Sequence, residues 1–331
     1  MTAMRAAVRD RYGPPESVRV EEVDRPEPAD DQVLVRVRAA SINRADLDGL
    51  YPRWQFTRLF TGLRRPKSRR LGLDVAGVVE AVGPQVTAFQ VGDAVFADLS
   101  LSRPGQGAFA EFVCERGGLF SRMPDGLGFE DAATLPHAGI LALQGLRRRD
   151  GRTFEPGARV LIEGASGNVG PFAVQIAKAR GAEVTGVCSP EKVEFVRSLG
   201  ADHVIDYRSL DYTKSTERYD WILAVDAHHS LLGSQRALAP GGVFVALGGP
   251  SGWMLSSIVV TPAIALATDR WAGMMFWWKP FAPDDVAALK DLVAAGAITP
   301  RIDRRYPLDE VVAALRHVDE GRPAGKVVVL P

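Results

Sequence analysis

The chain has 331 residues with 40 basic and 40 acidic side chains, and this balance excludes an overall charge that would draw it to nucleic acid or an anionic membrane. The length exceeds what one hydrophobic core usually supports, so we expect two domains. The two cysteines, Cys114 and Cys188, lie far apart, which excludes a disulfide framework and a cysteine zinc cluster. Because the start of the chain is also charged and lacks a signal-peptide core, we expect a cytoplasmic protein.

The first part of the chain, from residue 4 to about 120, consists of short alternating segments separated by Gly, Pro and Asp. This pattern predicts a strand-rich domain, a partly open barrel. Residues 129–149 space their apolar side chains as a helix does and form a connector. From residue 159, apolar runs alternate with helices that we expect at 168–180 and 191–199. The pattern requires a doubly wound parallel sheet, so the fold class is α/β.

The last third of the chain begins with an apolar stretch, WMLSSIVVTPAIALAT at residues 253–268. It falls short of the roughly 20 residues that a membrane helix needs and contains Pro262, so we expect buried lining and no membrane span. Residues 283–296 and 307–321 are expected to form amphipathic helices, each with an acidic start and a glycine stop. GKVVVL near the end predicts one more strand, free to return to the first domain.

A glycine-rich turn follows the strand RVLIEG and opens a helix. Gly164, Gly167 and Gly170 allow a tight turn, close approach of a ligand to the backbone, and close packing of the helix on the strand. The N–H groups of residues 168–171 and the positive end of the helix dipole suit a pyrophosphate. The turn predicts a dinucleotide site, and a merely tight turn is the alternative.

The choice of nucleotide depends on the end of the next strand, VTGVCSPEK. NAD sites usually place a carboxylate there, and its charge would repel a 2′-phosphate. Here Cys188 and Ser189 occupy that place, and Lys192 follows within reach of a phosphate. Lys192 read alone is a solvated lysine at a helix start, but the missing acid favours NADPH.

The segment GASGNVGPFAVQIAKARGAEVTGVCSPEKVEFVRSLGADHVIDY, with SINRADL, GLDVAGVVEAVG, TLPHAGILALQGL and GRPAGKVVVL, resembles the medium-chain dehydrogenase/reductase superfamily, in its zinc-free quinone oxidoreductase branch. The resemblance implies a GroES-like catalytic domain at 1–125, completed by about 265–331. It implies a Rossmann NADP-binding domain at 126–264, an active cleft between the two, and a homodimer joined through sheet edges near VFVALGG.

The resemblance also implies the residues that hold the cofactor. Its phosphate contacts fall on Ser189, Lys192 and Tyr207, with Arg322 as a fourth. Asn168 stands where relatives usually have glycine, and its side chain would either crowd the pyrophosphate or bond to it. The full set of expected cofactor-binding residues is Gly164, Ser166, Gly167, Asn168, Val169, Gly170, Ser189, Lys192, Tyr207 and Arg322.

Zinc-dependent members of the superfamily supply a cysteine where this chain has Asn43-Arg44, and a Gly-His-Glu segment where it has Gly72-Leu73-Asp74. We therefore expect no metal. Without a Lewis acid, hydride transfer favours acceptors that delocalise charge, namely small hydrophobic quinones or conjugated carbonyls. The resemblance implies Asn43, Asp46 and Tyr51 as catalytic candidates; a turn former, a helix cap and a packing residue are the alternatives.

Other readings remain open at this point. Within enzymes, the alternative is a biosynthetic enoyl reductase or an alcohol dehydrogenase; outside them, it is a non-catalytic NADPH-binding protein with nucleic-acid or membrane-surface partners. The basic loop 64–70 is a solvated loop, a partner site, or a guide for an anionic substrate. His137 is expected to be a satisfied helix residue, and His228-His229 a loop beside the nicotinamide. Residues 274–281, MMFWWKPF, form core, a subunit interface, or a wall of the substrate pocket.

Overall fold

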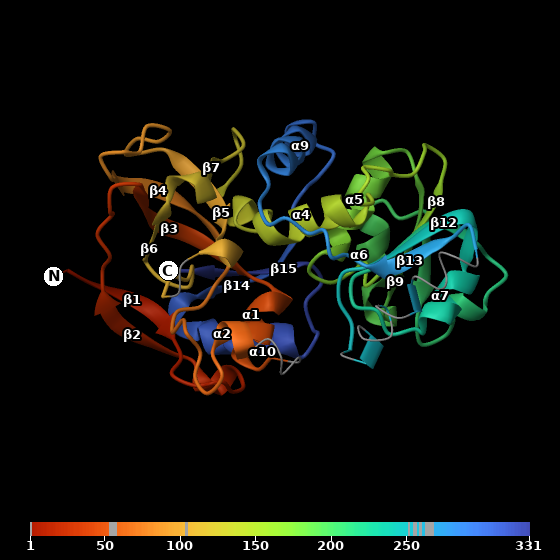
Figure 1. Cartoon of the computed structure of the whole chain (residues 1–331), viewed down its shortest axis with the longest axis horizontal. Coiled ribbons are helices and arrows are strands. Elements are labelled where there is room, and N and C mark those ends of the chain that lie inside the picture. Colours follow the sequence, from red (N-terminus) through yellow and green to blue (C-terminus); the bar gives the residue numbers. More distant parts are fainter. Residues whose placement is uncertain are drawn as a thin grey trace. The chain divides into compact units, whose positions relative to one another are not determined.

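The computed structural model describes residues 2–52, 58–102, 105–250, 252–253, 257, 260–261 and 268–331. The chain divides into two compact units, each with its own sheet (Figure 1). Unit 1 comprises Met1–Ala138, Pro280–Lys290 and Pro300–Pro331, and unit 2 comprises Gly139–Lys279 and Asp291–Thr299. Both ends of the chain thus belong to the same unit.

The main sheet of unit 1 has the strand order β14-β15-β3-β4-β5-β7, and β6 pairs with β3. Its strands β3, β4 and β15 are rich in valine and other small apolar side chains and are buried along most of their length. β15 pairs antiparallel with β3, so the end of the chain completes a sheet that its beginning starts. The strands are β3 Gln32–Ile42, β4 Asp74–Val82, β5 Ala94–Asp98, β6 Phe112–Arg116, β7 Ser121–Arg122, β14 Ile302–Pro307 and β15 Lys326–Leu330, and β1 Ala3–Val8 pairs separately with β2 Arg19–Asp24.

Short helices surround this sheet. Helix α10 packs on β15, β14 and β3, and also on α1, while α3 packs on β3 and β4. The core beneath them is built from the inward side chains of β3, β4, β5 and β15. The helices are α1 Arg44–Leu50, α2 Arg58–Thr61, α3 Phe129–Ala132 and α10 Val311–Asp319; α4 Pro136–Gly145 and α9 Pro283–Ala294 begin in unit 1 and end in unit 2.

Unit 2 contains a parallel sheet with the order β10-β9-β8-β11-β12-β13. In chain order this is 3-2-1-4-5-6, the doubly wound arrangement that reverses direction between β8 and β11. Helix α5 packs on β8 and β9, α6 on β9 and β10, and α7 on β12 and β13. The elements are β8 Arg159–Glu163, α5 Gly170–Ala179, β9 Glu183–Cys188, α6 Val193–Ser198, β10 His203–Asp206, β11 Tyr219–Ala224, α7 Leu231–Arg236, β12 Leu238–Ala246 and β13 Trp271–Met274.

The predicted α/β class is confirmed, and the differences are local. The helix expected at 168–180 is α5, Gly170–Ala179, and the one expected at 191–199 is a 3-10 turn, Pro190–Lys192, followed by α6. The sheet edge placed near VFVALGG was wrong. β13 pairs with β12 there, because the apolar WAGM segment supplies a further strand that the sequence analysis missed.

The apolar stretch 253–268 falls largely outside the described residues. Within the part of the chain that the structure covers, no helix is both long enough and apolar enough to cross a bilayer.

Candidate active site

The turn between β8 and α5 has the geometry that its glycines require. Gly164 has a φ of +80°, which favours glycine. The amides of Gly164 and Ala165 donate to the carbonyl of Val187 at 3.1 and 3.0 Å, which fixes the turn against β9. At Gly170 an added Cβ would lie 2.1 Å from the carbonyl oxygen of Gly164. The backbone therefore passes too closely over itself for any side chain at position 170.

This turn lies at the point where the sheet reverses its strand order. β8 is the first strand, and its neighbours β9 and β11 lead the chain to opposite sides. In open parallel sheets of this kind, ligands bind outside the carboxyl ends of the strands at that point. The topology and the turn thus identify one candidate dinucleotide site within unit 2.

The predicted residues of the turn differ in exposure. Ser166 and Val169 are buried and pack the turn, whereas Gly167 and Asn168 are half-buried. An added Cβ at Gly167 would meet only the Gly164 carbonyl oxygen, at 3.5 Å, an ordinary contact. The space over Gly167 is therefore the part of the turn that is open to a ligand.

The three residues predicted for the phosphate follow the carboxyl ends of β9 and β10. The Lys192 amide donates to the Ser189 carbonyl at 3.0 Å, and the Tyr207 amide donates to the Cys188 carbonyl at 3.2 Å. Tyr207 is 54% exposed. Arg322 does not belong to this unit: it lies in unit 1, where its guanidinium pairs with Glu320 at 2.6 Å.

The side chain that ends β9 is uncharged. Burial raises the pKa of the Cys188 thiol to about 11, and the charge of Asp206 adds to the rise. A neutral thiol there would not repel a 2′-phosphate, in contrast to the carboxylate of NAD sites. The carboxylate of Asp206 on β10 accepts from the Arg208 amide at 2.9 Å.

A buried carboxylate at the end of β8 escaped the sequence analysis. Glu163 is 8% exposed and accepts a hydrogen bond of 3.0 Å from the Tyr212 hydroxyl. Burial raises the pKa of Glu163 to about 7, although the hydrogen bond from Tyr212 opposes the rise. His229 lies 3.9 Å from Glu163 and 3.6 Å from Asp211. The available signal was an acid that closes the apolar run RVLIEG.

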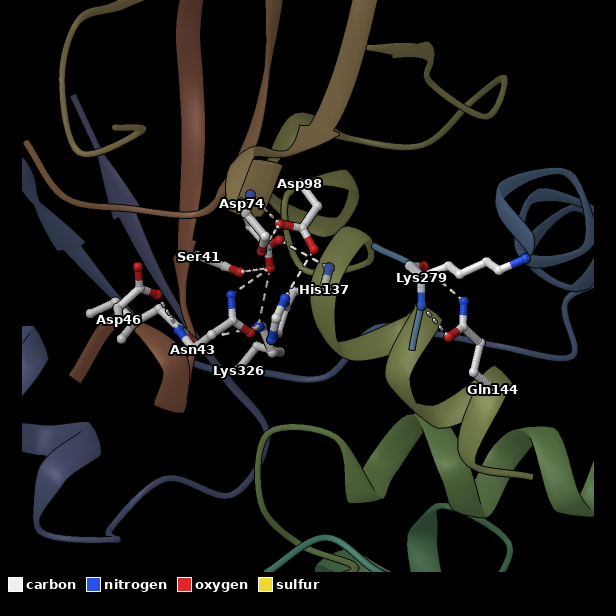
Figure 2. A network of polar contacts seen from close by, with 11 residues as sticks. Ser41, Asn43, Asp46, Asp74, Asp98, His137, Gln144, Lys279 and Lys326 are labelled. Carbon is white, nitrogen blue, oxygen red and sulfur yellow. Dashed lines mark hydrogen bonds and ion pairs between the residues drawn. The ribbon is translucent and has the colours of Figure 1, made fainter. Parts of the chain in front are cut away.

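In unit 1, Asn43 follows the last residue of β3 and caps α1, and it is fully buried. Its amide nitrogen donates to Asp74 at 2.8 Å, and its amide oxygen accepts from the Lys326 ammonium at 2.7 Å (Figure 2). The amide oxygen thus faces a positive charge and the amide nitrogen a negative one, and these two contacts fix the orientation of the amide. Asn43 therefore lies in the turn between β3 and α1, as one expectation had it, and it also belongs to a polar network.

Asp46 and Tyr51 lie at the two ends of α1. The Asp46 carboxylate accepts from the Asn43 amide N–H at 2.7 Å, which caps the first turn. Burial raises the pKa of Asp46 to about 7, against that hydrogen bond, and the charge of Asp74 adds to the rise. The Tyr51 hydroxyl donates to Asp319 on α10, and burial together with this partner raises the pKa of Tyr51. The structure therefore joins Asn43 and Asp46 but pairs Tyr51 elsewhere.

His137 lies in the first turn of α4 and has hydrogen-bond partners, as expected. Its Nδ1 lies 2.9 Å from Asp98, and its backbone amide donates to Asp74 at 2.9 Å. Burial alone would lower the pKa of His137, but the charge and hydrogen bond of Asp98 outweigh it and raise the pKa. Asp74, Asp98 and Lys326 were not predicted as members of a site; each is a charged residue at the end of an apolar strand.

Comparison with known proteins agrees with this arrangement. Residues 29–144 match the alcohol dehydrogenase GroES-like domain, and residues 199–329 match a family described as zinc-binding dehydrogenase. The human protein named NAD(P)H oxidoreductase RTN4IP1, mitochondrial, is 33% identical over 99% of this chain and 89% of its own length. The chain belongs to the medium-chain dehydrogenase/reductase superfamily.

Other members of the superfamily extend the likeness. An Arabidopsis thaliana protein, NADPH-dependent alkenal/one oxidoreductase, chloroplastic, is 32% identical over 99% of this chain and 80% of its own. The solved quinone oxidoreductase from Coxiella burnetii is 28% identical, covers 100% of both chains and has a TM-score of 0.87. The relatives are thus NAD(P)H quinone-type oxidoreductases, and the predicted GroES-like domain is confirmed.

In the described part of the chain, the residues around Asp74 do not suit the zinc ion that the family description names. The Asp74 oxygens already accept from Ser41 at 2.9 Å, from Asn43, and from the His137 amide. Zinc needs thiolate, imidazole or carboxylate lone pairs turned toward one point. In the described ranges, no group of three or more His, Cys, Asp or Glu side chains could hold a metal ion.

The aromatic segment MMFWWKPF borders a pocket within unit 2. Residues 276–279 and the loop 147–151, together with Trp271, line a hollow of about 1160 Å³. The Gln144 side chain fixes the segment, because it donates to the Lys279 carbonyl at 2.8 Å and accepts from the Lys279 amide at 3.0 Å (Figure 2). Phe276 is 65% exposed, so the segment is not simply core.

The basic loop 64–70 is exposed over most of its length. The Arg69 guanidinium pairs with Asp10 at 2.8 Å and with Glu21 at 3.0 Å, while Arg64 and Arg65 are exposed. A role of this loop in binding a partner or in guiding an anionic substrate stays a prediction.

Proposed function

We propose that this chain is an NADPH-dependent, zinc-independent reductase that transfers hydride to a quinone or an α,β-unsaturated carbonyl. The observation that carries the proposal is the β8–α5 turn at the strand-order reversal, where Gly170 leaves no room for a Cβ and Gly167 leaves its face open. A dinucleotide pyrophosphate suits such a turn at a helix N-terminus.

The residues that would hold the cofactor are those of the turn, from Gly164 to Gly170, with Ser189, Lys192 and Tyr207 at its 2′-phosphate. When bound, NADPH supplies the hydride. The neutral thiol of Cys188 supports the choice of the phosphorylated nucleotide. Arg322 stays a proposal as the fourth phosphate contact.

Replacing Lys192 with alanine is expected to raise the dissociation constant for NADPH about tenfold or more, because one charge-assisted contact to phosphate is lost. NADH, which lacks that phosphate, should bind nearly as before. Fluorescence titration of both nucleotides measures the two constants, with Lys290→Ala on α9 as the matched control. Equal losses for the two nucleotides would refute the phosphate role of Lys192.

The substrate class follows from how negative charge is stabilised after hydride transfer. A saturated ketone concentrates that charge on one oxygen, which a metal usually stabilises, whereas a quinone or enone spreads it. The hydrogen bonds that already occupy the Asp74 carboxylate support conjugated acceptors as the substrate class. The names of the relatives support the same class. We further propose that the α1 region acts on the substrate side, with Tyr51 donating or stacking, and Asn43 and Asp46 holding its first turn.

The substrate proposal is tested by following NADPH absorbance with a panel of quinones, enones and saturated ketones. We expect turnover of the conjugated acceptors and at least tenfold lower kcat/KM for saturated ketones. Tight NADPH binding without any turnover would favour the non-catalytic alternative. Equal rates with saturated ketones would favour the alcohol dehydrogenase alternative.

The edge strand of the parallel sheet bears on the oligomeric state. In the described part of unit 2, β13 has a strand partner on one side only, and pairing this edge with a second copy would cover it. We therefore propose a homodimer.

The two cysteines bear on the compartment in which the protein works. Cys114 and Cys188 are both free and buried, which agrees with a reducing compartment such as the cytoplasm.

A further inference from the structure

A lysine is buried inside unit 1. Lys326 is the first residue of β15 and is 1% exposed. Because Val327 pairs with Ile42, the last residue of β3, the register delivers the Lys326 side chain to the place where β3 turns into α1. Charged side chains are rarely buried to this degree without partners.

The ammonium group has three oxygen neighbours. It donates to the Asn43 amide oxygen at 2.7 Å and to the Ile42 carbonyl at 3.4 Å, and it lies 3.5 Å from the Asp74 carboxylate (Figure 2). Two of these contacts are hydrogen bonds, and the third is an ion pair. Isolated, this charge would be too costly to bury.

Asp74 is the matching anion and is fully buried. Its carboxylate accepts from the Ser41 hydroxyl, the Asn43 amide group and the His137 backbone amide. Burial raises the pKa of Asp74 and lowers that of Lys326, and each of the two charges opposes the effect of burial on the other. The three neutral donors favour the ionised carboxylate.

We propose that Lys326 is the resident cation of unit 1: its ammonium takes the electrostatic place of a divalent metal ion beside Asn43 and Asp74, and positions the first turn of α1. A metal ion would need the oxygen lone pairs of Asn43 and Asp74. Those lone pairs face N–H and O–H donors instead, and the Asn43 amide is oriented with its oxygen toward the ammonium. The positioning acts through Asn43, which caps α1 and whose backbone amide binds Asp46.

Other charged and titratable side chains surround Lys326. Asp46 on α1, Asp98 at the end of β5 and His137 on α4 face the same region as Asp74. His137 and Asp98 form a pair of their own at 2.9 Å. Without Lys326, the Asp74 carboxylate would lose its principal positive neighbour, and Asp46 would keep only His137 as a positive neighbour among these groups.

The test compares Lys326→Met, Asp74→Asn and the double variant with the wild type by thermal unfolding of the full chain. Breaking one side of a buried ion pair should lower the unfolding midpoint by about 10 °C in each single variant. The double variant should recover at least half of that loss, because no unpaired charge remains. Lys67→Met, at an exposed lysine of unit 1, should leave the midpoint unchanged.

The pH dependence separates this electrostatic role from simple packing. In Lys326→Met, Asp74 loses the charge that lowers its pKa, so its pKa in the folded state rises further above the unfolded value. Such a group stabilises the fold below its unfolded pKa and loses that contribution as the pH rises through the folded pKa. The deficit of Lys326→Met relative to the wild type should therefore shrink between pH 8 and pH 5. A constant deficit, or purely additive losses in the double variant, would overturn the proposal.

Metal analysis gives a second readout, which does not use unfolding. The wild-type protein, incubated with Zn²⁺ and desalted without a chelator, should retain no stoichiometric zinc. About one zinc per chain, lost in Asp74→Asn, would overturn the proposal. These readouts do not depend on turnover, so a failure of the reductase activity would leave them interpretable.

Discussion

Replacing Gly170 with alanine is expected to lower the free energy of unfolding by about 3 kcal/mol, at the upper end of what overpacking usually costs. The new Cβ would lie 2.1 Å from the Gly164 carbonyl oxygen and 2.6 Å from the Cα of Ala165. Both are backbone atoms of the same turn, so no side-chain rotation relieves the contact. Chemical unfolding measures the loss, and NADPH binding should fall with it.

Gly167→Ala is the matched control, because its Cβ would make only an ordinary contact of 3.5 Å. We expect this variant to keep the stability of the wild type. If the pyrophosphate lies over the open face of the turn, the same methyl group should still weaken NADPH binding tenfold or more. A Gly167→Ala variant that binds NADPH normally would contradict that placement, and a stable Gly170→Ala would contradict the close approach of the turn to itself.

Replacing Asp46 with asparagine should remove a large pH dependence of stability. The pKa of Asp46 rises from 3.8 to about 7 on folding. Because the folded pKa is the higher one, this carboxyl stabilises the fold fully below pH 4, and the contribution is lost as the pH rises through 7. A rise of about three in the pKa corresponds to a contribution of up to about 4 kcal/mol to the free energy of unfolding. Asparagine still offers an oxygen to the Asn43 amide but cannot ionise, so the variant should be the more stable protein at pH 8.

The measurement is urea unfolding at several pH values between 4 and 8. Asp74, His137 and Lys326 also face Asp46, and the difference between variant and wild type isolates its contribution. Asp48→Asn, on the same helix but paired with Arg44 at 3.6 Å, should keep the wild-type profile. Identical profiles for Asp46→Asn and the wild type would show that Asp46 stays ionised when buried.

The features that the sequence predicted are those encoded locally. The alternation of apolar runs and helices predicted the doubly wound sheet, and three glycines in seven residues predicted the β8–α5 turn. Ser189, Lys192 and Tyr207 were expected at the ends of neighbouring strands, and they lie there. Their contacts with a nucleotide stay predictions.

The features that were missed depend on contacts between distant parts of the chain. Lys326 and Asp74 look like ordinary charged residues at strand ends, and only the pairing of β15 with β3 brings them together. Glu163 meets Tyr212 for a similar reason, since both lie at the carboxyl edge of one sheet. β13 was missed because four residues rich in apolar side chains carry too short a pattern to identify a strand.

The pairing of β15 with β3 has a consequence for how the protein is made. A ribosome releases β3, β4 and α1 long before it releases β15, so the nascent chain carries Asp74 without its counter-charge and β3 with an uncovered edge. Unit 2 is translated in the interval and contains its whole parallel sheet. During synthesis, unit 2 can therefore fold before unit 1 is complete, because unit 1 still lacks β15.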